Sequence, residues 1–160
     1  MLGFVAFAAM RHGGQEGGVG LDQQAVVAVL NRILEHELAG VVRYTHFSFM
    51  VFGHGRIPIV SWLRKQADES LLHAQEAGEM VTLLGAHPSL AIGALLDAPE
   101  HDIDALLRKS LEGERAAVAL YRNLLDLVKD ASVTLEEYAR RMIANEELHV
   151  GEVEKMLRRS

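Results

Sequence analysis

The sequence predicts an all-α protein, a four-helix bundle built from two antiparallel hairpins that a long crossover joins. From Asp22 onward, apolar residues recur at intervals of three and four, which is the period of an α-helix. Glycine and proline break this pattern at a short turn over residues 53–56 and at a longer segment between Gly85 and Pro99. The longer segment, about fifteen residues, can return the chain from one end of the bundle to the other.

The helix ends carry capping signals. Asp22 is a suitable N-cap for the first helix, and Pro58 lies in the first turn of the second. Ser132 or Thr134 can cap the fourth helix. The glycine-rich residues 1–21 are expected to form a flexible leader, which leaves residues 22–160 for the bundle. The first three helices are expected to end near Phe52, Leu84 and Val128, the third to begin near Asp102, and the fourth to run to the chain end.

Composition excludes several classes of protein. The chain has no cysteine, so disulfides, thiolate metal ligands, iron–sulfur clusters and thiol nucleophiles are excluded. Its formal charge of -6, from 16 Lys and Arg against 22 Asp and Glu, argues against nucleic-acid binding. No apolar run approaches the roughly 20 residues that cross a bilayer. We therefore expect no membrane partner and a cytoplasmic protein.

Glutamate interrupts the apolar inner stripe of every expected helix, and in two helices a histidine follows one turn later on the same face. The glutamates of each hairpin are 32 residues apart, so both hairpins bring them to the same depth. An offset of 77 residues relates the two halves and also places Tyr44 on Tyr121. The polar stripe residues are Glu37, Glu69, His73, Glu114, Glu146 and His149.

Burying four glutamates together requires a compensating positive charge. An unpaired buried ion costs several kcal/mol, whereas a whole domain is stable by only about 5–15 kcal/mol. No lysine or arginine is expected on an inner stripe near this depth. Four carboxylates and two imidazoles suit two ions such as iron or manganese. The alternative is that some of the glutamates are protonated or hydrated inside a wet bundle.

The sequence resembles bacterioferritins in three stretches, LNRILEHELAGVVRY (30–44), LLGAHPSL (83–90) and NEELHVGEVE (145–154), and the similarity covers roughly residues 26–157. Bacterioferritins belong to the ferritin-like superfamily, whose signature is Glu, Glu-x-x-His, Glu, Glu-x-x-His. The resemblance implies a di-iron centre in which these side chains are both the ligands and the catalytic groups. It implies Glu69 and Glu146 as bridging ligands, Glu37 and Glu114 as terminal ligands, and His73 and His149 as one imidazole per iron.

The first histidine motif departs from this signature. Glu69 precedes His73 by four residues instead of three, and Ser70 occupies the position three residues before His73. We predict a π-bulge across residues 69–73 that absorbs the inserted residue and returns His73 to the metal. The alternative is that His73 is an ordinary core histidine with Ser70 or Glu76 nearby.

Haem, a cage and a simple monomer are not expected. Bacterioferritins bind haem through a methionine directly after the second-helix glutamate, where this chain has Ser70 or, in the other register, Leu71. The residues after His149 are too few for the fifth helix that surrounds the fourfold axis of a 24-subunit bacterioferritin. The end of the first helix is more apolar than one stripe can bury, which predicts a homo-oligomer, at least a dimer, through Phe47, Phe49, Met50, Val51 and Phe52.

These features predict a protein that binds two iron ions per chain, with manganese or zinc as other possible occupants. By resemblance the activity is that of a ferroxidase, in iron storage or detoxification. One alternative is a di-iron peroxidase or oxygenase of the rubrerythrin or hydroxylase type, and a hydroxylase would show a pocket beside the metals. Another is a non-catalytic helical interaction protein whose site has decayed. Tyr44 and Tyr121 either hydrogen-bond ligand carboxylates or fill the core, and His36 is expected in solvent or at an interface.

Overall fold

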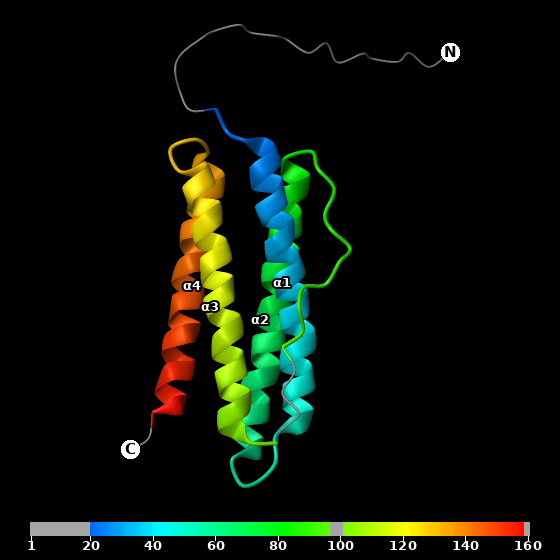
Figure 1. Cartoon of the computed structure of the whole chain (residues 1–160), viewed down its shortest axis with the longest axis vertical. Helices are drawn as coiled ribbons and strands as arrows, with labels where there is room; N and C mark the ends of the chain where they lie inside the picture. Colours follow the sequence, from blue (N-terminus) through cyan, green and yellow to red (C-terminus); the bar gives the residue numbers. More distant parts are fainter. Residues whose placement is uncertain (1–19, 97–100, 159–160) are drawn as a thin grey trace, which may run out of the picture.

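The computed structural model describes residues 20–96 and 101–158, and it confirms the all-α architecture. Most of the expected leader, residues 1–19, lies outside this part of the chain. Figure 1 shows two hairpins side by side, with the segment after the second helix running back along the first helix. The helices are α1 (Gln23–Met50), α2 (Arg56–Leu83), α3 (Ile103–Val128) and α4 (Val133–Leu157).

Side-chain caps begin three of the four helices. Asp22, Asp102 and Ser132 each accept a hydrogen bond from the backbone N–H three residues further on. The prediction for Asp22 is therefore confirmed, and Ser132 rather than Thr134 caps α4. Along the described ranges, none of the helices is both long enough and apolar enough to span a membrane.

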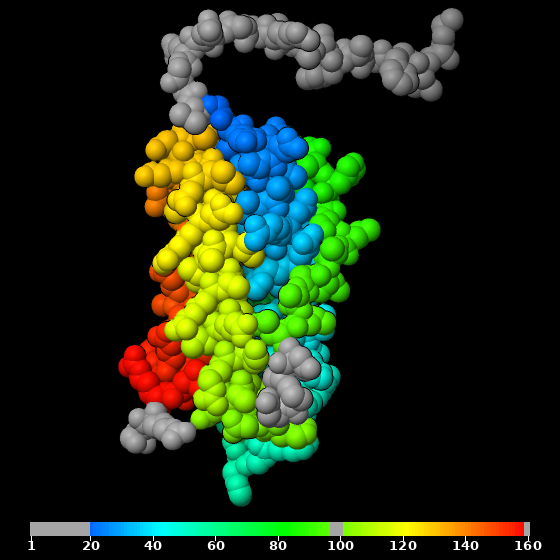
Figure 2. All heavy atoms as spheres, viewed as in Figure 1, coloured from blue at the N-terminus to red at the C-terminus, as the bar shows by residue number. Residues whose placement is uncertain are grey.

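The crossover is fastened to the outer side of α1. The Gly93 N–H donates to the Glu35 carbonyl at 2.8 Å, and the Ser89 N–H donates to Asn31 Oδ1 at 2.8 Å. A Cβ atom at Gly93 would lie 3.0 Å from that Glu35 carbonyl oxygen, so the close approach favours glycine. Figure 2 shows the crossover filling the surface beside α1.

Two apolar clusters fill the bundle and leave a polar layer between them. One cluster contains Leu30 and Ile33 of α1 with residues from all the other helices, and the second contains Tyr44 and Phe47 further along α1. Glu37 lies between the two clusters on α1 and is only 4% exposed. The core thus isolates a set of buried polar side chains near the middle of the bundle.

Candidate metal centre

Two groups of three potential metal ligands lie in this polar layer and share one carboxylate. Glu37, His73 and Glu146 form the first group, and Glu114, Glu146 and His149 form the second. Within each group, one ligand atom per residue lies within 4.8 Å of the others. Five of the six predicted ligands therefore meet in the structure.

Glu146 presents one oxygen to each group. Its Oε1 lies 2.9 Å from Nδ1 of His73, and its Oε2 lies 3.5 Å from Nδ1 of His149. The buried Oε1 nevertheless has no hydrogen-bond partner among the described residues. A metal ion between Oε1 and the imidazole would satisfy both, and three carboxylates with two imidazoles suit iron or manganese. The residues present thus fit a metal ion at each of the two ligand groups.

A tyrosine from each hairpin hydrogen-bonds a glutamate of the other. The Tyr121 hydroxyl donates to Glu37 Oε1 at 3.0 Å, and the Tyr44 hydroxyl donates to Glu114 Oε1. Of the two interpretations of these tyrosines, the structure supports hydrogen bonding to the candidate ligands. Such outer partners hold ligand carboxylates in position.

The centre combines groups whose pKa values are shifted in opposite directions. Burial, and then the charges of Glu146 and Glu114, raise the pKa of Glu37 well above its usual value. Burial also pushes the pKa of Glu146 upward, but the imidazoles of His149 and His73 beside its oxygens outweigh burial and hold the pKa below its usual range. Hydrogen bonds to Glu114 and Glu146 raise the pKa of His149 to about 10. Without metal, His149 therefore keeps a proton at neutral pH, and Glu37 holds a proton more strongly than an ordinary glutamate does.

A family model described as a ferritin-like domain matches residues 27–160. The chain belongs to the ferritin-like domain family. No protein among those of curated function matches its sequence.

Solved structures of the ferritin-like class share its fold. A ferritin-like diiron-carboxylate protein from Bacillus anthracis is 21% identical with a TM-score of 0.81, over 86% of this chain and 98% of that one. A dodecameric thioferritin, the bacterioferritin-related protein of Bacteroides fragilis, is 23% identical with a TM-score of 0.80, over 86% of each chain. The bacterioferritin of Rhodobacter capsulatus is 23% identical with a TM-score of 0.78, over 87% of this chain and 86% of that one. The resemblance to bacterioferritins is thereby confirmed at the level of family and fold.

Helix α2 of this ferritin-like bundle is a regular α-helix across residues 69–73, so the predicted π-bulge is wrong. His73 still reaches the centre, where its Nδ1 lies 3.8 Å from Glu37 Oε1 as well as close to Glu146. The reason is that the extra residue displaces the glutamate and not the histidine. Ser70, three residues before His73, takes the buried inner position.

Glu69 lies at the edge of the centre, with 30% of its side chain exposed. One oxygen is 3.4 Å from Lys65 Nζ, and the other accepts a hydrogen bond from Gln66 Nε2 at 2.8 Å. The second oxygen also lies 3.4 Å from His149 Nε2. Glu69 thus contacts a candidate ligand but belongs to neither group, and its bridging role stays a prediction.

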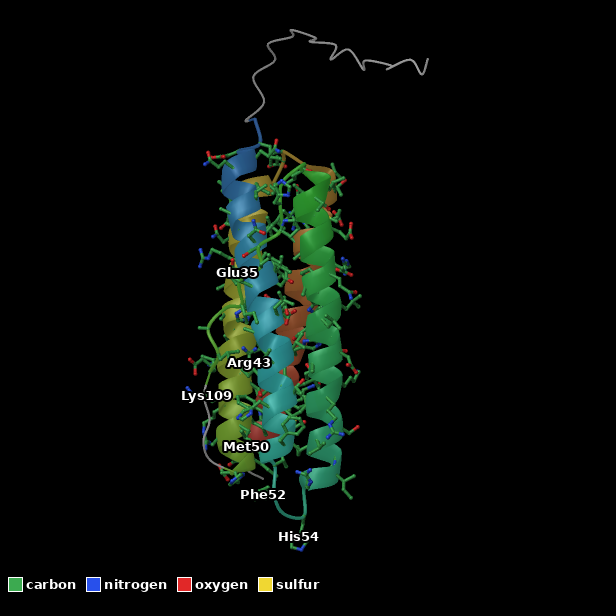
Figure 3. The ribbon with its side chains drawn as sticks, turned by 90° about the vertical axis from the view of Figure 1, so that its right-hand side faces the viewer. Glu35, Arg43, Met50, Phe52, His54 and Lys109 are labelled. Atoms are coloured by element: carbon green, nitrogen blue, oxygen red, sulfur yellow. The ribbon has the colours of Figure 1, made fainter. Side chains whose placement is uncertain are left out.

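Arg43 is a buried cation beside the centre that was not predicted from the sequence. The expectation concerned the inner stripe, and Arg43 brings a positive charge to this depth from outside that stripe. Its side chain is 4% exposed and lines the same central cavity as the candidate ligands. Figure 3 shows Arg43 on α1 where α1 and α3 run alongside each other. Its Cα lies off the inner stripe, but the long side chain carries the guanidinium inward over Gly113. Glycine at position 113, beside Glu114, is the sequence signal that could have indicated this space.

His36, which was expected in solvent or at an interface, is half-buried between α1 and α3. Its Nε2 is 3.1 Å from the Gly113 carbonyl oxygen, the geometry of a hydrogen bond from the ring N–H. Burial, and then the charge of Arg43, lower the pKa of His36. The neutral imidazole of His36 therefore joins α1 to α3 beside the centre through this hydrogen bond.

A surface pocket of about 270 Å³ opens onto the centre between α2 and α4. Glu69, His73 and His149 line its inner part, and Leu72 and Leu148 line its outer part with Asn145. The central cavity behind it is much smaller, about 10 Å³ for the centre of a water-sized sphere. The centre is therefore reachable from the surface but has no internal space for a large molecule.

Proposed function

We propose that this ferritin-like protein binds two iron ions per chain and oxidises Fe(II) with dioxygen or peroxide, in iron storage or detoxification. The observation that carries the proposal is the pair of ligand groups that share Glu146, with one carboxylate oxygen facing each. Two bound ions would supply two one-electron oxidations side by side. Manganese or zinc suits the same donors and would compete for them.

The protein side chains would hold the ions and manage protons. Glu146 would bridge, while Glu37 and Glu114 would each bind one ion with orientations fixed by Tyr121 and Tyr44. Because the pKa values of His149 and Glu37 are raised, the arriving ions would displace a proton from His149 and would compete with protons for Glu37.

The pocket between α2 and α4 would be the route for incoming Fe(II). Glu69 lies in this pocket, partly exposed, and contacts His149 directly. A carboxylate at that position attracts a divalent cation from solvent and lies next to an imidazole that can receive it. Glu69 would therefore act in metal uptake whether or not it also bridges.

Elemental analysis tests the proposal. The protein is loaded anaerobically with Fe(II), desalted and analysed, and its absorption is followed when air is admitted. We expect near two irons per chain and a new near-ultraviolet band on oxidation, and less than one iron in Glu146→Ala. The control is Glu147→Ala, which removes an exposed carboxylate paired with Arg122. One iron or none in the unmodified protein would contradict the proposal and favour the non-catalytic interaction protein.

One observation favours the oxygenase alternative. Leu72 and Leu148, on the two sides of the surface pocket, are 53% and 69% exposed, so its outer part would accept a small apolar molecule. Fe(II) supplied in excess distinguishes the two functions. A ferroxidase continues to consume Fe(II) in air beyond two equivalents per chain, whereas an oxygenase stops until an organic substrate and a reductant are supplied.

Homo-oligomerisation, at least to a dimer, belongs to the same proposal. Phe49 and Phe52 are 59% and 56% exposed at the end of α1, while Phe47 and Val51 are buried within their own chain. The Bacteroides fragilis protein is described as dodecameric. A monomer by light scattering at about micromolar concentration would contradict the proposed homo-oligomer. Haem is not included, since neither Ser70 nor Leu71 offers a thioether ligand.

A further inference from the structure

We propose that Arg43 holds one small anion, of the size of hydroxide, fluoride or chloride, beside the two groups of metal ligands. The inference rests on the proposed function, because the guanidinium lines the same cavity as these ligands. It gives the centre an exogenous ligand site on the α1 and α2 side.

The guanidinium of Arg43 is buried with two of its three nitrogen atoms unpaired among the described residues. Its Nε and Nη1 atoms are inaccessible to solvent and have no hydrogen-bond partner among the described residues. The ion pairs of the centre join its carboxylates to His73 and His149, and none includes Arg43. The charge of Glu37 acts on this cation, but the buried Nε–H and Nη1–H groups still lack an acceptor among the described residues, and an unsatisfied buried donor costs free energy.

Two glycines and the Tyr44 ring surround the guanidinium of Arg43. A Cβ at Gly113 would lie 2.5 Å from Nη2, and a Cβ at Gly40 would lie 3.7 Å from it. The Tyr44 ring centre lies 5.2 Å from Cζ. The offset of 77 residues pairs Arg43 with Leu120, so only the first half carries this charge. The buried arginine therefore belongs to one half of the bundle only and is not part of the 77-residue repeat.

The same half lacks a carboxylate. In a regular α2, Ser70 precedes His73 by three residues, as Glu146 precedes His149 on α4. Ser70 is 7% exposed, and its Oγ would lie 2.7 Å from a Cβ at Gly40. A serine side chain is too short to reach the middle of the centre as Glu146 does. The space that a glutamate at position 70 would fill is thus left on the side where Arg43 lies.

The size and charge of this space define the ligand. The central cavity offers about 10 Å³ for the centre of a water-sized sphere, which is room for one such species. The guanidinium on one side and bound metal on the other both favour a negative charge. A halide or hydroxide satisfies both conditions, and sulfate is too large.

Halide titration of the full-length protein tests the inference. Chloride and fluoride are added to Co(II)-loaded protein at constant ionic strength, and the visible cobalt absorption and the cobalt content are followed. Sulfate is the comparator, and the same titrations are made by calorimetry on metal-free protein. We expect a saturable halide response, no sulfate response, and at least a tenfold weaker halide response in Arg43→Leu with cobalt content unchanged. Arg115→Leu, which removes an exposed cation paired with Glu154, is the control.

A second variant keeps the test decisive if Arg43→Leu does not fold. Ser70→Glu places a carboxylate beside Arg43 and is expected to abolish the halide response. The inference would be overturned if neither the cobalt-loaded nor the metal-free unmodified protein responded to halide. It would also be overturned if Arg43→Leu responded as strongly as the unmodified protein, or if Ser70→Glu left the halide response unchanged. If cobalt does not bind but metal-free protein binds halide through Arg43, the anion site stands and the proposed function fails. If cobalt binds without any halide response, only the anion site fails.

Discussion

The two hairpins bring similar side chains to the centre in different ways. In the second hairpin, Glu114, Glu146 and His149 form a complete ligand group without help from α1 or α2. The first hairpin supplies only Glu37 and His73, and its group is completed by Glu146 from α4.

The difference follows from one residue of register on α2. The regular helix keeps the histidine inward and turns the glutamate toward the surface, so the first half loses a buried negative charge. On α1 the same half gains a buried positive charge, Arg43. The ligand group of the second hairpin is thus complete by itself, whereas the group of the first hairpin depends on Glu146 from the second.

The largest expected effect comes from removing one imidazole at a time. Loss of even an outer partner of a ligand costs about 10–100-fold in metal affinity, so loss of a ligand costs more than about 100-fold. His149→Ala is expected to leave one ion on Glu37, His73 and Glu146, and His73→Ala to leave one on the second-hairpin group. Metal per chain and calorimetry measure this. Loss of both ions in His73→Ala would show that the second-hairpin group is not self-contained.

The second expected effect is a pH dependence of metal binding. The pKa of His149 is raised to about 10, and that of Glu37 is raised as well, so metal must displace a proton from His149 and competes with protons for Glu37. Affinity should rise by up to about tenfold per pH unit for each proton released. Calorimetry in buffers of different ionisation enthalpy counts these protons. Affinity that is independent of pH between about 6 and 8 would contradict the protonation described for the centre.

The same raised pKa values fix the sign of the stability change without metal. The folded protein binds more protons than the unfolded chain above pH 4.5 for Glu37, and between pH 6.5 and about 10 for His149. Its free energy of unfolding should therefore fall as pH rises through these windows. Glu146 acts oppositely, because its lowered pKa contributes stability above pH 4.5 that is lost on acidification. Urea titrations of metal-free protein at several pH values measure the balance.

The sequence predicted the helices and most of the centre for identifiable physical reasons. The helical period and the caps are local properties, so Asp22 and Ser132 could be assigned from their neighbours alone. Equal spacing within the hairpins placed Glu37 and Glu146 at one depth, because antiparallel helices convert equal separations into equal heights. These predictions needed no knowledge of tertiary contacts.

The sequence could not predict which residue of α2, Glu69 or Ser70, points into the centre. Residues three and four positions before a histidine both lie on its side of a helix, so packing decides whether Ser70 or Glu69 points inward. Arg43 was missed for a related reason. A stripe is defined by Cα positions, but an arginine side chain is long enough to move its charge from the flank of a helix to the core.

The third expected effect compares the two tyrosines that cross between hairpins. Tyr44→Phe removes the hydrogen bond to Glu114, and Tyr121→Phe removes the one to Glu37. Each should weaken binding of the corresponding ion by about 10–100-fold. Tyr138→Phe is the control, since Tyr138 packs edge-on against Tyr121 but makes no hydrogen bond to a candidate ligand. If Tyr138→Phe weakens metal binding as much as either of these variants does, both tyrosines act through core packing.

The fourth expected effect concerns Glu69, the residue that α2 turned outward. Glu69→Gln keeps its size and removes its charge. Because Glu69 lies outside both ligand groups, we expect less than about a tenfold loss of affinity, smaller than for a directly bound ligand, but slower uptake of Fe(II). Stopped-flow absorption measures the rate, with Glu79→Gln elsewhere on α2 as the control. Loss of a whole ion per chain would show that Glu69 binds metal directly.

The smallest expected effect tests whether the hairpins differ only at the centre. Gly78 of α2 and Gly151 of α4 lie inside helices, and a Cβ at either would meet nothing within 4 Å. Alanine should therefore stabilise each hairpin by about 0.5–1 kcal/mol, because glycine loses more backbone freedom on folding. Urea denaturation of Gly78→Ala, Gly151→Ala and the double variant measures both changes and their additivity. A markedly smaller gain in the free energy of unfolding for Gly78→Ala than for Gly151→Ala would mean that the altered motif of α2 also weakens this helix away from the centre. The difference between the hairpins would then not be confined to their ligands.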